Sequence, residues 1–195
     1  MNKLLVVDLC GTIVRRNTTH DFMRHFVPGL ARRRVALLIL SRAGGFLFRF
    51  FTPGLQRKCL VACLRGVDRS ELERLGLEYA RSTLALHPRK DVLDRIRLAQ
   101  QQGVPVVLAS ASLDFIVAGF ARALGVDAAV STQLVYRNSQ QCHGRIERDS
   151  TGRKLELLRE YVGSGDLEFE VITDNPEDSD LMAVASKVWF IHAQD

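Results

Sequence analysis

The sequence predicts an α/β protein built on a doubly wound parallel sheet. Short apolar runs with the composition of buried strands alternate along the chain with segments whose apolar residues recur at the helical period. This alternation is typical of a parallel sheet with helices on both faces. The length of 195 residues is enough for one good hydrophobic core, or for a core with a small insertion.

The predicted elements follow one another in a simple order. Apolar runs predict strands at residues 3–9, 104–109, 128–134, 168–173 and 187–191. Helical periodicity predicts helices at residues 90–102, 113–124 and 154–162. The stretch after the third strand contains Asn138-Ser139 and Gly144, which are residues typical of turns. We therefore expect a β-excursion there, before the last of these helices.

Polar residues stand at the ends of three predicted strands and at the start of one helix. Asp8 lies at the end of the first run, Ser110 follows the second, and Asp174 follows the fourth, with Asp178 four residues further on. Lys154 opens the last predicted helix. These are the positions at which open α/β sheets bind ligands. Taken singly, each has a simpler interpretation, because a strand-end Asp or Ser often caps a helix and a lysine is often a solvated helix residue.

Together these residues suit phosphate chemistry. A carboxylate can attack a phosphate only if the negative charges are neutralised, which requires a divalent cation and a lysine facing the same oxygens. Asp8, Asp174, Lys154 and Ser110 supply such a set. Hard oxygen ligands favour Mg²⁺, which takes one or two carboxylates and completes its shell with water and phosphate.

In this order, the four segments resemble the signatures of the haloacid dehalogenase superfamily. Its phosphatases carry Asp-x-Asp-Gly-Thr where this chain has Asp8-Leu9-Cys10-Gly11-Thr12. The resemblance implies that Asp8 is the catalytic nucleophile and forms an aspartyl-phosphate. It also implies that the substrate is bound by Thr12, which orients the first loop, and by Ser110 and Lys154. The implied ligands of a Mg²⁺ cofactor are Asp8, Cys10 through its backbone carbonyl, Asp174 and Asp178, the last supporting the shell.

Residues 15–22, 108–113 and 175–182 are similar to the subfamily that contains phosphoserine phosphatase and phosphatidylglycerophosphatase C-like hydrolases. This resemblance implies a small helical cap inserted after the first strand. We expect residues 1–13 and 86–195 to form the catalytic core and residues 14–85 to form the cap. The expected substrate is a phosphorylated small molecule or a lipid phosphate.

Cys10 stands where the family has its second Asp, the general acid and base. Such proton transfer is typically worth about 10²–10⁴-fold in rate, and a thiol, with an ordinary pKa of about 8.5, replaces a carboxylic acid poorly. Two hypotheses remain open. Cys10 either leaves a slow phosphohydrolase, or marks a degenerate member that binds a phosphorylated ligand, a membrane surface or a partner without efficient turnover. Phosphonate cleavage through Lys58 has little further support, and dehalogenation is disfavoured because Asp174 and Asp178 are retained.

The expected cap is strongly basic. Residues 14–84 hold 14 Lys and Arg against 5 Asp and Glu, although the net charge of the whole chain is +5. Within them, residues 32–58 combine arginines with Phe46, Phe48, Phe50 and Phe51, which resembles an interfacial cationic segment that contacts an anionic membrane. Arg42, Arg49 and two glycines interrupt the run too often for a membrane-spanning helix. The alternative is that these aromatic residues form the core of the cap.

Other classes of function are less favoured. Aromatic residues interleaved with a basic groove are not evident, so we expect no nucleic-acid binding. The four cysteines lack the spacing of a zinc site. The first apolar run begins at residue 4 without a preceding secretory signal, which predicts a cytoplasmic protein, with the basic segment allowing peripheral membrane contact.

Overall fold

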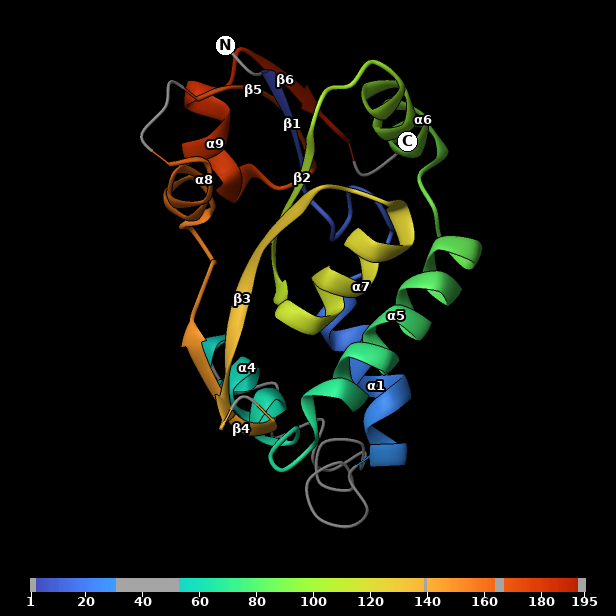
Figure 1. The fold of residues 1–195 in the computed structure, drawn as a ribbon, viewed down its shortest axis with the longest axis vertical. Coiled ribbons are helices and arrows are strands. Elements are labelled where there is room, and N and C mark those ends of the chain that lie inside the picture. Colours follow the sequence, from blue (N-terminus) through green and yellow to red (C-terminus); the bar gives the residue numbers. More distant parts are fainter. Residues whose placement is uncertain (1–2, 31–52, 139, 164–166, 193–195) are drawn as a thin grey trace.

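The computed structural model describes residues 3–30, 53–138, 140–163 and 167–192. At its centre is a six-stranded sheet in the order β4-β3-β2-β1-β5-β6 (Figure 1). The strands are β1 (Lys3–Val7), β2 (Val106–Leu113), β3 (Ala128–Arg137), β4 (Gln141–Arg148), β5 (Glu168–Thr173) and β6 (Lys187–Phe190). Neighbours from β3 to β6 pair in parallel, whereas β4 runs antiparallel to β3. The predicted doubly wound sheet is therefore confirmed, and the β3–β4 hairpin is the predicted β-excursion.

Helices cover both faces of the sheet (Figure 1). One core cluster joins Leu5 and Val7 of β1 to the helices α1 (Thr18–Leu30), α4 (Pro53–Ala62), α5 (Arg69–Leu86), α6 (Lys90–Gln101) and α7 (Asp114–Leu124). A second cluster joins Leu4 and Val6 of the same strand to α8 (Lys154–Val162) and α9 (Ser179–Val184). The two clusters use alternate residues because successive side chains of a strand point to opposite faces.

Strand β2 ends differently from the prediction. The apolar pattern stops at Ala109, yet the strand continues to Leu113, and its pairing with β3 changes register between Ala109 and Leu113. The backbone of residues 110–112 is thus released from the regular ladder at the carboxyl end of the strand. Irregular pairing of this kind redirects side chains next to functional sites.

Helix α5 packs closely on α7. A Cβ atom on Gly119 would lie 2.4 Å from the carbonyl oxygen of Gly76, and one on Gly76 would lie 2.3 Å from the carbonyl oxygen of Phe115. Beside this crossing, the ring of Phe22 in α1 contacts Tyr79 of α5 and Phe115 of α7, with centroids 5.6 and 5.0 Å apart. The two glycines let the backbones of α5 and α7 approach closely. The Phe22 contacts then bring α1 into the same core cluster.

The described part of residues 14–85 consists mainly of helices α1, α4 and α5. The division into a core and a cap stays a prediction. The Arg- and Phe-rich stretch falls mostly on residues 31–52, which lie outside the described residues. Among the residues that are described, none of the helices has the length and apolar character needed to cross a membrane.

Candidate active site

The carboxyl ends of β1, β2 and β5 meet the start of α8 around one pocket of about 340 Å³. Asp8 follows β1, Asp174 follows β5, and Lys154 is the first residue of α8. Most of the predicted site residues line this pocket. The lining includes Asp8, Cys10, Ser110, Lys154, Asp174 and Asn175. A parallel sheet brings these distant segments together because its strands all end at the same edge.

Lys154 holds two carboxylates at the base of this site. Its Nζ donates to Asp8 Oδ1 at 2.7 Å and to Asp178 Oδ2 at 2.8 Å, and the lysine side chain is 3% exposed. The hydroxyl of Thr173 also donates to Asp178, at 2.7 Å. Burial alone would lower the pKa of Lys154, but the two carboxylates outweigh it and raise that pKa above its ordinary value. The lysine is therefore charged at neutral pH.

At Asp8, unlike at Lys154, the effect of burial on the pKa outweighs that of the neighbouring charges. Burial raises its pKa to about 6, with Lys154 opposing the shift and the nearby charge of Asp178 adding to it. Two buried carboxylates thus share one lysine, which leaves an excess of negative charge when both are ionised. This excess fits the binding of a cation beside Asp8.

Asp174 contacts the loop that follows β1. The hydroxyl of Thr12 donates to Asp174 Oδ1 at 2.8 Å, and the Asp174 backbone N–H donates to the same hydroxyl at 2.9 Å. Gly11 has a φ of +77°, and a Cβ atom there would lie 1.9 Å from Asp174 Oδ2. Only glycine fits this position. Thr12 is fully buried and is not part of the pocket lining. Its two hydrogen bonds with Asp174 orient that carboxylate and the loop after β1.

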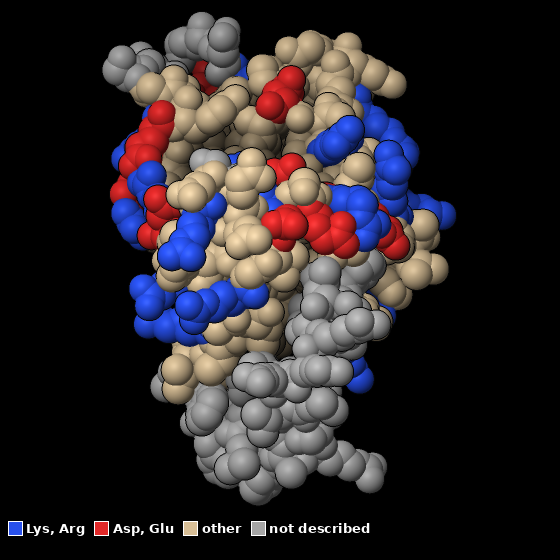
Figure 2. Space-filling view, turned by 60° about the horizontal axis from the view of Figure 1, so that its bottom comes forward, with Lys and Arg blue, Asp and Glu red and all other residues tan. Residues whose placement is uncertain are grey.

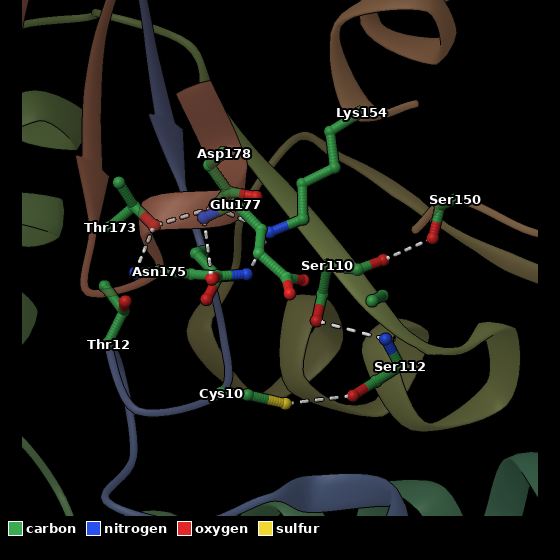
Figure 3. A network of polar contacts seen from close by, with 12 residues as sticks. Cys10, Thr12, Ser110, Ser112, Ser150, Lys154, Thr173, Asn175, Glu177 and Asp178 are labelled. Carbon is green, nitrogen blue, oxygen red and sulfur yellow. Dashed lines mark hydrogen bonds and ion pairs between the residues drawn. The ribbon is translucent and has the colours of Figure 1, made fainter. Parts of the chain in front are cut away.

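Asp178 is also turned away from the pocket, toward Lys154 and Thr173 (Figure 3). Within the described ranges, no three His, Cys, Asp or Glu side chains gather into a metal-ligand set. A hard cation at Asp8 and Asp174 would therefore draw its remaining ligands from a backbone carbonyl, water and substrate. That is the ordinary coordination of Mg²⁺.

Cys10 lies on the other side of the pocket, and its sulfur points toward the hydroxyl of Ser112 (Figure 3). Its Sγ is 3.1 Å from Thr18 Oγ1 and 3.1 Å from Ser112 Oγ, and those two hydroxyl oxygens are 2.5 Å apart. Thr18 and Ser112 are both buried. No sequence pattern indicates that α1 and the end of β2 approach each other there, so neither hydroxyl could be predicted to lie beside Cys10.

Two further residues at the site were not predicted from the sequence. Asn175 lines the pocket, and its side-chain oxygen accepts the N–H of Glu177 at 3.0 Å, which caps the short 3-10 turn Pro176–Asp178. Arg89, which is buried, donates through Nε to the carbonyl of Gly11 at 2.8 Å. The capping asparagine had a sequence signal in Asn175-Pro176. The arginine had none, because its partner is a distant backbone atom.

Comparison of the sequence with protein-family models identifies the same class of protein as the fold and the pocket. A family model described as haloacid dehalogenase-like hydrolase matches residues 5–183. The chain belongs to this family, and the resemblance inferred from its four segments is confirmed.

Individual relatives are distant. The chain is 23% identical to protein CicA of Caulobacter vibrioides over 191 residues, which cover 94% of this chain and 83% of the relative. It is 20% identical, with a TM-score of 0.79, to a crystal structure of a protein of unknown function from Bordetella pertussis, covering 97% of this chain and 90% of that one. A structure of a phospho-aspartyl intermediate analogue of phosphoserine phosphatase has 18% identity and a TM-score of 0.57, covering 98% and 87%. At these identities the solved structures show a shared fold.

Proposed function

We propose that this protein is a Mg²⁺-dependent phosphohydrolase that cleaves phosphate monoesters through an aspartyl-phosphate on Asp8. The observation that carries the proposal is the buried Lys154, which holds one oxygen of Asp8 at the base of a pocket also lined by Ser110. The other carboxylate oxygen of Asp8 is the proposed nucleophile. The phospho-aspartyl analogue of the related phosphoserine phosphatase supports the same chemistry.

The phosphate-binding groups have donors left for a substrate. Two of the three Lys154 N–H groups bind carboxylates, so the third is assigned to a phosphate oxygen. Ser112 N–H donates to Ser110 Oγ at 3.2 Å, which occupies that oxygen as an acceptor and leaves the Ser110 proton to donate into the pocket. Asp8 and Asp174, with the backbone carbonyl of Cys10, are the proposed ligands of Mg²⁺. When bound, the cation would neutralise phosphate charge.

In the proposed reaction, Asp8 forms a bond to phosphorus as the bond between phosphorus and the leaving oxygen breaks. Water then attacks the aspartyl-phosphate, releasing inorganic phosphate and restoring the Asp8 carboxylate. Both steps need a proton moved, to the leaving oxygen and from the water. Cys10 offers a thiol held between two hydroxyls rather than a carboxylic acid. We therefore assign the enzyme to substrates whose leaving groups need little protonation.

A second candidate function follows from the same cysteine. Without a carboxylate at this position, the protein would bind a phosphorylated ligand and turn it over slowly or not at all. The two candidates are separated by measuring phosphate release from an aryl phosphate with Mg²⁺ and with excess EDTA. We expect release that depends on Mg²⁺. Binding of inorganic phosphate without any release would favour the second candidate.

We further propose a lipid phosphate as a second, slowly hydrolysed substrate class, because its alkoxide leaving group needs protonation, and an anionic membrane as a peripheral contact. The support is the basic composition of residues 14–84, together with a band of Lys and Arg side chains on one flank of the molecule that no acidic side chain interrupts (Figure 2). Binding to anionic vesicles should be strong at low salt and weak at high salt, because such contacts are screened. Equal failure to bind anionic and neutral vesicles would exclude the membrane contact.

A further inference from the structure

Arg57 of helix α4 contacts the segments that carry Ser110 and precede Lys154, the proposed phosphate-binding residues. Its guanidinium donates to Asp149 Oδ1 at 3.0 Å, to Thr151 Oγ1 at 2.5 Å and to Thr132 Oγ1 at 2.6 Å, and also to the carbonyl oxygen of Ala111. The arginine side chain is 20% exposed. One side chain of α4 thus contacts three separate stretches of the sheet region: the end of β2, the middle of β3 and the turn before α8.

The first of these contacts acts on Ser110. Arg57 and the hydroxyl of Thr132 both donate to the carbonyl of Ala111, the latter at 3.1 Å. The N–H of the same peptide unit belongs to Ser112 and donates to Ser110 Oγ. Because a peptide unit is planar, fixing its carbonyl also fixes the direction of its N–H. Arg57 therefore helps to set the orientation of the Ser110 hydroxyl.

The second set of contacts acts on the turn that leads into Lys154. Asp149 Oδ1 accepts the N–H of Thr151 at 2.9 Å, and Arg57 binds the side chains of both residues. Ser150, between them, donates its hydroxyl to the carbonyl of Ser110 at 2.8 Å. The 149–151 turn and the end of β2 are therefore hydrogen-bonded to each other, and Arg57 binds both. The turn ends three residues before the start of α8 at Lys154.

Helix α4 itself is fixed against the β3–β4 hairpin. Gly144 of β4 has a φ of +71°, and a Cβ atom there would lie 2.9 Å from Arg65 Cβ and 3.3 Å from Ala62 Cα. Just after the helix, the backbones of Gly66 and Val67 exchange hydrogen bonds with that of Cys142, both at 2.8 Å. The end of α4 is thus tied to the hairpin, which gives Arg57 a defined place from which to reach the pocket.

We propose that Arg57 is a positioning residue that couples α4 to the phosphate-binding groups Ser110 and Lys154. The inference rests on the phosphohydrolase function proposed above and deepens it. Arginine suits the role because its planar guanidinium carries five donors in a fixed fork, whereas the ammonium of lysine is a single compact charge. Arg57 does not touch the reacting atoms. It acts through the Ala111–Ser112 peptide and the 149–151 turn.

The test compares Arg57→Lys and Arg57→Ala with Arg74→Gln. Arg74 is an exposed arginine of α5 whose ion pairs with Glu71 and Glu78 stay within its own helix, so this variant controls for a lost charge. The readouts are the KM and kcat for an aryl phosphate, the inhibition constant of inorganic phosphate, and amide hydrogen exchange of residues 109–113 and 149–155. We expect both Arg57 variants to weaken phosphate binding and lower kcat/KM about 10- to 100-fold, the range that small misplacements cost. Exchange in both segments should rise.

Two further results decide between positioning and general stability. Millimolar methylguanidinium should restore phosphate binding to Arg57→Ala, and should not affect Arg74→Gln. Wild-type phosphate affinity and exchange in both Arg57 variants would overturn the inference, as would equal losses in Arg74→Gln. If the wild-type protein binds inorganic phosphate without hydrolysing esters, the proposed function fails, while the phosphate affinities and the exchange rates still decide the role of Arg57.

Discussion

The two sides of the pocket are built from different chemistry. On one side, the buried Lys154 links Asp8 to Asp178, and Thr173 adds a further hydrogen bond. On the other side, Cys10 contacts the hydroxyls of Thr18 and Ser112. The first side carries three formal charges, with the Lys154 ammonium 2.7 Å from Asp8 and 2.8 Å from Asp178. The Cys10 cluster is made of hydroxyls and a thiol.

Under the proposed function, this difference separates phosphate binding from proton transfer. Lys154 and Asp8 are buried and paired, and in the proposed function they hold and attack the phosphate. The cluster around Cys10 can fill space and form hydrogen bonds, but it lacks a carboxylic acid to move protons at neutral pH. We therefore expect phosphate binding to be retained and proton transfer to be reduced.

The largest effect is expected on the charged side. Asp8→Asn removes the proposed nucleophile while preserving the shape of the side chain, and should lower phosphate release by about 10⁴-fold or more, as loss of a nucleophile does in other hydrolases. The measurement is turnover of an aryl phosphate with saturating Mg²⁺. Asp91→Asn, an exposed acid in the first turn of α6, is the control. Comparable turnover by Asp8→Asn and the wild type would remove Asp8 from the mechanism.

Lys154→Met tests the charge balance of the same side through stability. The substitution leaves Asp8 and Asp178 buried without their shared cation, and breaking a buried ion pair in this way costs about 3–5 kcal/mol. Urea unfolding at pH 8 measures the free energy of unfolding. Lys90 also begins a helix but is exposed, so Lys90→Met should have little effect. The two variants losing the same stability would contradict the buried role of Lys154.

Cys10→Asp tests the other side by restoring a carboxylic acid. The hydroxyls of Thr18 and Ser112 are placed to donate to it, each lying 3.1 Å from the present sulfur. Hydrolysis of an aryl phosphate should rise by about 10²-fold or more through regained acid–base catalysis, with a larger gain for alkyl phosphates. Cys10→Ala should show no gain. A Cys10→Asp protein that folds and binds Mg²⁺ yet turns over neither class would place the limitation elsewhere and favour the non-catalytic function.

The smallest effect concerns the cation. Mg²⁺ at ten times its Kd should stabilise the native state by about 1.4 kcal/mol through preferential binding, seen as a rise in Tm. Asp174→Asn should lose most of this rise, while Glu177→Gln, an exposed neighbour, should keep it. An undiminished response in Asp174→Asn would exclude that carboxylate from the metal site.

Much of the fold was determined by local sequence pattern. The β5 strand (Glu168–Thr173) and the α8 helix (Lys154–Val162) lie where apolar periodicity predicts them. The placement of Asp8, Ser110, Lys154 and Asp174 around one pocket also followed from sequence, because the ends of parallel strands meet at one edge. The strand and the helix depend on residues within a few positions of one another, which is the range over which a sequence pattern is informative.

Other features were decided by the tertiary structure alone. Sequence could not show that Asp178 faces Lys154 rather than the pocket, that Thr12 sits behind Asp174, or that Cys10 meets Thr18 and Ser112. Each of these contacts is made by a side chain whose direction depends on how separate elements pack. The reach of Arg57 to the carbonyl of Ala111 is the clearest case, since 54 positions separate the two residues. Every residue has a backbone carbonyl, so the sequence cannot indicate which one Arg57 binds. The packing of α4 against the β3–β4 hairpin determines that it is the carbonyl of Ala111.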